Sequence, residues 1–534
     1  MFRNSTLTLL AILCLVAAMF AIANPTHADN TSNTIVVDTL DDVSRWEGNC
    51  SLRDAVIAAT SNRAQDGCVA GVDGHDTIEF APELQGGTIK LFKGELGVYD
   101  PLTVRGDVTI DAGYRSRIFK VANENPLTLE NLTLVHGKEY GGGAIIAYQS
   151  DLTLRNVTMD RNQAEVRGGA VVFYGGEFGR LDIQNSTFTR NTSQRNSGAV
   201  YIYNTTANIY NSRFESNFAD EIGGAIYSVE SLLSTAATTY FQNSASGGGA
   251  IYQLEGTLVM QGDELNRNRV GSYGGGVMIN GGDARILDSF FDTNSSRGIG
   301  AGIMIVEDGY LFLNGTDLQA NLAERDGGGL YSVYSEVVTI NASFTDNSAQ
   351  RSGGGAYLTN SQVSMRSTQF LANDAPQGGG IYNISSDLGM IDSSFFYNGA
   401  EQGGGIFSTT NWRNELSDVS LVRVTMNYNT AINGAAIMNW VRANADGNSH
   451  VEVAASTLEA NAGRDGTALF NHNASTLFNS NSVAQNEANA INNAKGDVTI
   501  WRSSLHTNQY NNCIGSINID AFWPNQDSDG SCNP

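Results

Sequence analysis

The feature that most constrains the fold is a repeat of about 26 residues that runs through most of the chain. Each repeat contains a bulky apolar residue followed three positions later by asparagine, as in Phe188/Asn191 and Phe291/Asn294. Between Asn191 and Asn398 these asparagines follow one another at steps of 25 to 27 residues. A glycine-rich segment such as Gly223-Gly-Ala-Ile recurs elsewhere in each repeat. Self-similarity at such a period is typical of solenoids.

The segments within a repeat predict strands rather than helices. Leu181–Phe188 and Val200–Tyr203 are short, rich in β-branched and aromatic residues, and bounded by polar turn residues. A period near 26 accommodates three short strands and three turns, each strand pairing in parallel with its counterpart in the next coil. The sequence therefore predicts an all-β, right-handed parallel β-helix, a pectate-lyase-like solenoid of about fourteen coils and roughly 65–70 Å in length.

The recurring asparagines and glycines favour structural roles, because catalysis needs a unique constellation and these residues repeat. Stacked at one turn, asparagine side chains can bond the turn backbone and each other, and asparagine tolerates a left-handed corner. The glycine pair suits a corner with positive φ. The clearest ladder positions are Asn191, Asn217, Asn294, Asn347 and Asn373. Two longer steps, before Asn429 and Asn461, predict loops of five or six extra residues.

The N-terminus is typical of an export signal. Arg3 precedes an apolar run, Leu9–Phe20, and Ala21-Ile-Ala or Thr26-His-Ala supplies a cleavage site. We expect residues 1–28 to be removed, residues 29–125 to form a cap with the first irregular coils, residues 126–511 to form the repeats, and residues 512–534 to form a tail. No later apolar stretch is long enough for a transmembrane helix.

Four cysteines remain after signal removal, as two local pairs at the two ends of the mature chain. In an oxidising compartment this spacing favours the disulfides Cys50–Cys68 and Cys513–Cys532. Between the first pair, Ser51 and Asp54 resemble a capping box, and Leu52, Ala55, Val56 and Ala59 form one apolar stripe. We expect this helix to cover the open N-terminal end of the solenoid, because exposed strands and core there need a cap.

The tail contains the start of a calcium-loop pattern, Asn525, Asp527 and Asp529, followed by Gly530. The distal carboxylate of such a loop does not follow, so a polar turn closed by the disulfide is favoured over calcium, and no other cofactor is expected. The net charge of −24 argues against nucleic acid and anionic membranes as partners. We expect a monomer.

Three parts of the chain resemble known bacterial surface proteins. Val36-Val-Asp-Thr through Cys50-Ser-Leu-Arg-Asp-Ala looks like the CSLREA domain, with Asp54 where that name has Glu. The Gly-Gly-Ala-Ile and Phe-x-x-Asn repeats are similar to those of chlamydial polymorphic outer-membrane proteins, and Ser528-Asp-Gly-Ser-Cys resembles the end of choice-of-anchor Q proteins. The resemblance implies an exported β-helix, extracellular or attached to the cell surface or outer membrane, and in some relatives an adhesin. The C-terminal autotransporter barrel of polymorphic outer-membrane proteins is not recognised here.

One edge of the predicted stack is the candidate ligand site. The turn before the glycine segment carries mixed charges at Arg167, Arg195, Arg297, Arg325, Arg351, Arg464, Glu165, Glu221, Glu324, Asp326 and Glu401. Beside it runs a column of aromatic residues and methionine: Tyr201, Tyr227, Tyr252, Met278, Met304, Tyr331, Tyr357, Tyr382 and Phe407. If the column points outward it could stack on sugars; if it points inward it is core. Packing is the favoured interpretation, since periodicity leaves the direction open.

Two hypotheses for function follow. The favoured one is a non-enzymatic, adhesin-like protein that binds a glycan or another surface molecule, with Arg167, Arg325, Arg351, Tyr227, Tyr252 and Tyr382 at its ligand edge. The alternative is a polysaccharide lyase or glycoside hydrolase acting on acidic, pectin-like glycans. A hydrolase needs two carboxylates at a defined separation, and no such catalytic constellation is recognised.

Overall fold

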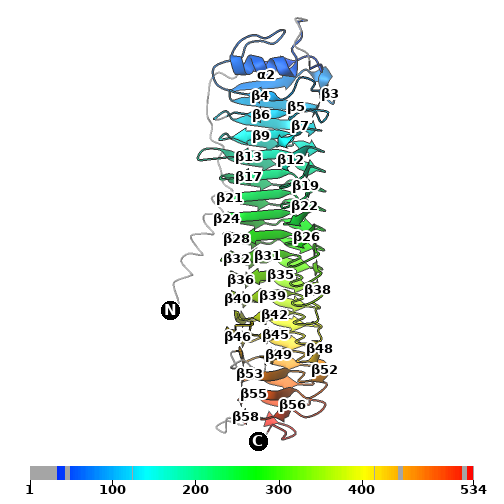
Figure 1. The fold of residues 1–534 in the computed structure, drawn as a ribbon, viewed down its shortest axis with the longest axis vertical. Helices are drawn as coiled ribbons and strands as arrows, with labels where there is room; N and C mark the ends of the chain where they lie inside the picture. The colour runs from blue at the N-terminus through cyan, green and yellow to red at the C-terminus, as the bar shows by residue number, and fades with distance from the viewer. Residues whose placement is uncertain are drawn as a thin grey trace.

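The computed structural model of the chain describes residues 33–42, 48–122, 124–413, 415–442, 449–519 and 526–532, so the predicted signal segment 1–28 lies outside the described residues. The described chain forms a rod, a parallel β-solenoid of about 17 turns set about 26 residues apart (Figure 1). The predicted all-β parallel β-helix is confirmed.

One coil illustrates the rest. It contains β17 (Val200–Tyr203), β18 (Thr206–Tyr210), β19 (Arg213–Glu215) and β20 (Phe218–Ala219). The coil has four strand segments instead of the predicted three, because Asn211 adopts a left-handed conformation, with φ 48°, and bends the chain between β18 and β19. Each segment pairs in parallel with the equivalent segment of the next coil, as Tyr201 does with Tyr227 and Phe214 with Tyr240.

The solenoid has more coils than the fourteen predicted. Four strands near the N-terminus already pair in parallel: β1 (Asn33–Val37), β2 (Asp76–Phe80), β5 (Leu102–Asp111) and β7 (Leu127–Val135). These coils precede Asn162, the first ladder asparagine, so a count based on asparagine positions misses them. These strands lie at the start of the chain, where the sequence analysis expects a cap with the first irregular coils, and continue into the repeats.

The ladder asparagines stack inside one corner of the rod. The Asn191 side-chain nitrogen donates to the Asn217 Oδ1 atom at 3.0 Å and to the Met159 carbonyl at 2.9 Å, while the Asn191 backbone N–H donates to the same Asn217 oxygen. The pattern continues without a break through both longer steps, from Asn398 to Asn429 and from Asn429 to Asn461. Because Asn191 is fully buried, the ladder replaces the hydrogen bonds to water that these groups lose.

The corner differs in one detail from the prediction. The left-handed residue is the one before each asparagine, such as Arg190 with φ 52° or Thr293 with φ 55°, and its type varies from coil to coil. The first glycine of the glycine segment does have positive φ, for example 62° at Gly168, where an added Cβ would lie 2.2 Å from the Val171 carbonyl oxygen. The asparagine corner is therefore held by side-chain hydrogen bonds. The glycine corner forms because glycine has no side chain to clash with the neighbouring backbone.

The predicted helix lies across the N-terminal end of the rod as α2 (Leu52–Ser61), against β1, β2 and β4 (Leu96–Val98) (Figure 1). The Ser51 hydroxyl caps it by accepting a hydrogen bond from the Asp54 backbone N–H. The Cys50–Cys68 disulfide is present, as predicted. Arg53 pairs with buried Asp42 at 2.6 Å and donates to the Gly94 carbonyl, so this arginine fastens the helix to the first coils.

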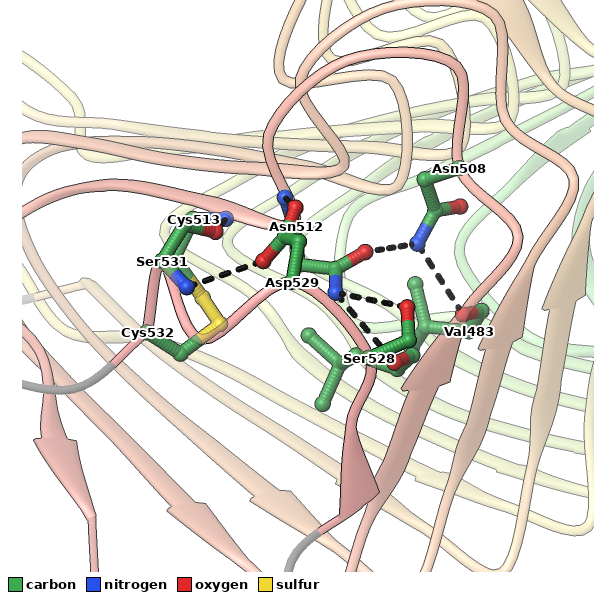
Figure 2. Close-up of a disulfide and its surroundings, with 9 residues drawn as sticks. Val483, Asn508, Asn512, Cys513, Ser528, Asp529, Ser531 and Cys532 are labelled. Atoms are coloured by element: carbon green, nitrogen blue, oxygen red, sulfur yellow. Dashed lines mark hydrogen bonds between the residues drawn. A yellow bond between two sulfur atoms is a disulfide. The ribbon is translucent and has the colours of Figure 1, made fainter.

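The C-terminal end is closed by the predicted disulfide between Cys513 and Cys532 (Figure 2). Next to it, the Asp529 carboxylate accepts hydrogen bonds from the backbone N–H groups of Asn512 and Ser531, each at 2.8 Å. Of the calcium candidates, Asn525 and the Asp527 side chain lie outside the described residues. Asp529 therefore serves as a cap for this turn, and calcium binding there stays a prediction.

Candidate ligand-binding face

The aromatic and methionine column lies on the outside of the rod. In β17 the side chains of Val200 and Ile202 belong to the main core, whereas Tyr201 between them belongs to a separate apolar cluster on the opposite face of the strand. We call the positions from Tyr201 to Phe407 the outer column. Its strands are β17, β21 (Ile226–Ala236), β24 (Ile251–Gln261), β27 (Val277–Asn280), β31 (Ile303–Val306), β35 (Leu330–Val333), β39 (Ala356–Thr359), β42 (Ile381–Ile384) and β45 (Ile406–Thr409).

The first half of the outer column is covered. Tyr201, Tyr227, Tyr252, Met278 and Met304 are all buried, although they point away from the main core. Ile222, Tyr273 and Ile299, from the turn before the glycine corner, pack over them. Burial raises the pKa of Tyr227 to about 12. The predicted packing role therefore applies to the first half of the outer column, whose side chains are buried in a small second cluster outside the main core.

The second half of the outer column is more open and forms a regular stack. The rings of Tyr331 and Tyr357 lie 4.8 Å apart and nearly parallel, Tyr357 and Tyr382 follow at 5.2 Å, and Tyr382 and Phe407 at 5.1 Å. The three tyrosines are only partly buried. Because the rings cover one another's faces, this stack offers mainly ring edges and hydroxyl groups to a ligand.

A second row of side chains runs beside the outer column. We call it the flanking ladder; its residues immediately precede the glycine corner and pair in parallel from coil to coil. Its first members are Arg167, Asn196, Ile222, Gly247, Tyr273 and Ile299, and its later members are Asp326, Ser352, Gln377, Gln402 and Asn433. The apolar members of the ladder, Ile222, Tyr273 and Ile299, all precede Asp326, and the members from Asp326 onward are polar, where the outer column becomes more open. The Gln377 amide donates to the Gln402 amide oxygen at 3.2 Å.

The strongest charge pair on this face joins Asp326 and Arg351. Asp326 is 1% exposed, and the Arg351 Nε atom donates to its carboxylate at 2.7 Å. Burial raises the pKa of Tyr331 and of Tyr382 to about 12, with the nearby Asp326 charge as a second cause. The pKa of Tyr357 is also raised, chiefly by burial. These hydroxyl groups therefore stay protonated at neutral pH and can donate hydrogen bonds.

The other predicted edge residues are placed less uniformly. Arg167 lies over the Tyr201 ring at 4.9 Å and donates to the Tyr174 hydroxyl at 3.3 Å. Arg195 forms an exposed ion pair with Glu221 at 3.0 Å. Arg325 is exposed, two residues before the glycine corner. Arg167 thus lies in the flanking ladder itself, while Arg195, Arg325 and Arg351 form a more exposed rim.

Sequence reasoning missed two features of this face. The amides of Gln377 and Gln402 occupy the same ladder position in successive coils, directly before the glycines, and this repetition was the available signal. A second outward row lies two residues after the outer column: Tyr148, Tyr174 and Tyr203 pair in register as its first members. The alternation rule places positions i and i+2 of a strand on one face, so this row could also have been found.

The insertions leave the rod from one turn, immediately after the outer-face strands. Residues 410–416 follow β45, and the chain enters another insertion after β49 (Ile437–Trp440), as the two longer asparagine steps predict. In the first, Asn411 is held by the Ser385 hydroxyl and by Asn360, and Trp412 is 82% exposed. Insertions in solenoids commonly gather on the binding side.

Among the described residues, no three His, Cys, Asp or Glu side chains are placed to share a metal ion. In the same residues, no helix has the length and apolar character needed to span a bilayer.

Comparison with known proteins gives three partial likenesses. Residues 211–229 match the model of the Chlamydia polymorphic membrane protein repeat. A stretch of 178 residues is 30% identical to metabotropic glutamate receptor-like protein R of Dictyostelium discoideum; it covers 31% of this chain and spans 11% of that protein. A solved structure of a PL6 family alginate lyase, AlyGC, aligns with 92% of this chain and 99% of its own at 10% identity, with a TM-score of 0.24, which supports no statement about activity. The chain is thus a parallel β-helix by its own strand pairing, and its residues 211–229 match a polymorphic membrane protein repeat.

Proposed function

We propose that the protein is a non-enzymatic, exported β-helix, extracellular or at the cell surface, that binds a glycan along its outer face. One observation carries the proposal: partly exposed tyrosines, Tyr331, Tyr357 and Tyr382, lie beside polar ladder residues in successive coils. Ring edges with phenol hydroxyl groups and adjacent amides suit sugars, because a sugar presents many hydroxyl groups that donate and accept hydrogen bonds. Because both rows repeat at the strand spacing of about 4.8 Å, they present similar contacts along the rod, as an extended polymer requires.

Binding is favoured over catalysis by what the charged groups contact. The hydrogen bond to the Asp326 carboxylate raises the pKa of Arg351 and so favours its protonated guanidinium form, which cannot accept a proton as a base. The raised pKa values of Tyr331 and Tyr382 oppose formation of a tyrosinate at neutral pH. A face of repeated, protonated donors fits recognition of a ligand better than proton abstraction from one.

A glycan array probed with the full mature chain tests the proposal. We expect binding that weakens several-fold in the double variant Gln377→Ala/Gln402→Ala and in Tyr357→Phe, which keeps the ring and removes its hydroxyl group. The matched control is Gln362→Ala, an exposed glutamine in β40 (Gln362–Arg366). Absence of binding across the array, or equal losses in the control, would contradict the proposal.

A polysaccharide-cleaving enzyme is the second candidate, and the Asp326–Arg351 pair beside the Tyr331 and Tyr357 hydroxyl groups is the observation that favours it. Incubation with polygalacturonate and calcium, followed by ultraviolet absorbance of unsaturated product, tests a lyase directly. We expect no product. Product formation that disappears in Arg351→Ala would replace the binding proposal with this one.

A further inference from the structure

The second outward row ends, toward the N-terminus, in a shallow open hollow of about 510 Å³. Its lining residues are Tyr148, Gln149, Tyr174, Gly176, Tyr203 and Asn204. The volume falls within the range of small-molecule sites, roughly 300–1,000 Å³. None of these residues is an acidic or basic residue.

The aromatic floor of the hollow is held in place by its neighbours. Tyr148 and Tyr174 stack at 5.3 Å with an interplanar angle of 7°, and Tyr203 meets the Tyr174 ring edge-on at 6.1 Å. Arg167 donates to the Tyr174 hydroxyl and lies over the Tyr201 ring, so it holds Tyr174 through contacts with uncharged groups. Tyr148 remains 36% exposed and offers its outer ring surface to a ligand.

A short insertion forms one wall. The segment 175–179 closes on itself through a hydrogen bond from the Gly179 N–H to the Gly175 carbonyl, and the Thr205 hydroxyl of the next coil donates to the Gly179 carbonyl at 2.6 Å. These bonds pin the wall to the rod. The insertion presents Phe178, which is 73% exposed, and Glu177 at its tip.

Two amides at the hollow are free to bind a ligand. Gln149 and Asn204 are exposed residues at left-handed turn positions, with φ 47° and 49°. In the part of the chain that the structure describes, neither side-chain amide has a hydrogen-bond partner. Each amide can therefore donate to and accept from a ligand's hydroxyl groups at once.

We propose that this hollow is a subsite for a neutral sugar unit, which packs on Tyr148 and is oriented by the amides of Gln149 and Asn204. The proposal rests on the glycan-binding function above and narrows it to uncharged sugars at this position. A uronate is disfavoured, because none of the residues that line the hollow is a cation and the neighbouring insertion carries the negative charge of Glu177; Arg167, which contacts Tyr174, is not one of the lining residues.

Saturation-transfer NMR of the full mature chain with neutral methyl hexosides, and with a methyl hexuronide, tests the subsite. We expect a signal with one or more neutral glycosides and little with the hexuronide. Tyr148→Ala should weaken binding about tenfold or more. Gln149→Gly and Asn204→Gly, which keep the positive φ, should each weaken it several-fold.

The matched controls are Tyr210→Ala, a 39% exposed tyrosine at the end of β18, and Asn341→Gly, an exposed left-handed asparagine on another turn. Neither should change binding. Equal or stronger binding of the hexuronide, no binding of neutral glycosides, or unchanged binding in the hollow variants would overturn the subsite. If the chain still binds polymers on the glycan array, the glycan-binding function is retained and only the subsite proposal fails. The two experiments therefore distinguish failure of the subsite from failure of the proposed function.

Discussion

Asn294 shows what a ladder residue does for the fold. Its side-chain nitrogen donates to the Leu265 carbonyl and to Asn321, and its oxygen accepts from the backbone and side chain of Asn268. Replacing Asn294 by alanine leaves these buried groups unsatisfied, so we expect a loss of about 1–3 kcal/mol in the free energy of unfolding. Chemical denaturation measures it. The exposed-site control Asn341→Gly should stay within about 0.5 kcal/mol of wild type; an unchanged midpoint in Asn294→Ala would contradict the role of the ladder.

The rod contains a second interior ladder, which the sequence analysis does not predict. In each coil it lies a few residues before the asparagine ladder. Small polar residues two positions before the bulky apolar residue accept backbone N–H groups from the previous coil, as the Ser212 hydroxyl does from Ser186 and the Ser289 hydroxyl from Asp263. This small polar position recurs with the same period as the asparagine three residues after the apolar residue, so the sequence carries a signal for it. One position departs from the pattern: Asp263 places a carboxyl group where neighbouring coils have serine or threonine.

Asp263 should make stability depend on pH. Burial raises the pKa of its carboxyl group to about 7, partly opposed by hydrogen bonds from Thr235 and Thr238. The folded state therefore binds this proton more tightly than the unfolded state does. The resulting contribution to the free energy of unfolding is full below the unfolded pKa of about 4 and is lost as pH rises through about 7. We expect Asp263→Ser to be more stable than wild type at pH 9 by about 4 kcal/mol at most, with a smaller gain at pH 5. Urea denaturation at both pH values checks it, and an equal difference at the two would contradict the raised pKa.

At the scale of elements, the two ends of the rod are closed differently: the N-terminal end by a helix with a disulfide, and the C-terminal end by a disulfide-closed turn. Removing the tail disulfide with Cys513→Ser/Cys532→Ser should release β57 (Cys513–Gly515) from β55 (Ile491–Trp501), since solenoids open from their ends when a cap is lost. Hydrogen exchange should then accelerate in β57 and leave β29 (Phe290–Asp292), in mid-rod, unchanged. Equal acceleration in both strands would show that the disulfide stabilises the whole rod instead.

The strands and corners were predictable because their residues repeat. Phe188 and Asn191 established the period, and Ser51 with Cys50 and Cys68 placed the cap. The direction of the tyrosine column was not predictable, because Val200, Tyr201 and Ile202 are all buried and show no polar alternation. The turn before the glycine corner covers Tyr201 from outside, a tertiary contact that local sequence does not reveal.

The interior of the C-terminal coils was also unpredicted. A row of buried polar side chains runs between coils: Asn383 donates to the Ser417 hydroxyl, the Ser449 hydroxyl donates to Asn439, and Asn471 donates to Asn493. These residues occupy inward strand positions that a hydrophobic pattern assigns to aliphatic side chains. Because their partners lie in other strands and coils, their pairing follows from the stack and not from the local sequence.

At the scale of the molecule, the coils should behave as interchangeable units. Removing residues 217–242 brings Asn191 opposite Asn243 and Tyr201 opposite Tyr252, which restores equivalent contacts. We expect a folded rod shorter by about 4.8 Å. Far-ultraviolet circular dichroism and small-angle scattering test it. Removing only residues 217–229 puts the ladders out of phase and should prevent folding; a well-folded product would contradict the ladder as the source of register.

The turn that carries the insertions has a consequence for how such a chain can change. The segment 175–179 and the segment 410–416 add residues without altering the strand pairing before or after them. Variation at this turn is thus decoupled from the scaffold: loops can be exchanged, lengthened or grafted there while the rod keeps its shape. New recognition loops can therefore arise at this turn in different coils while the strand pairing of the solenoid stays the same.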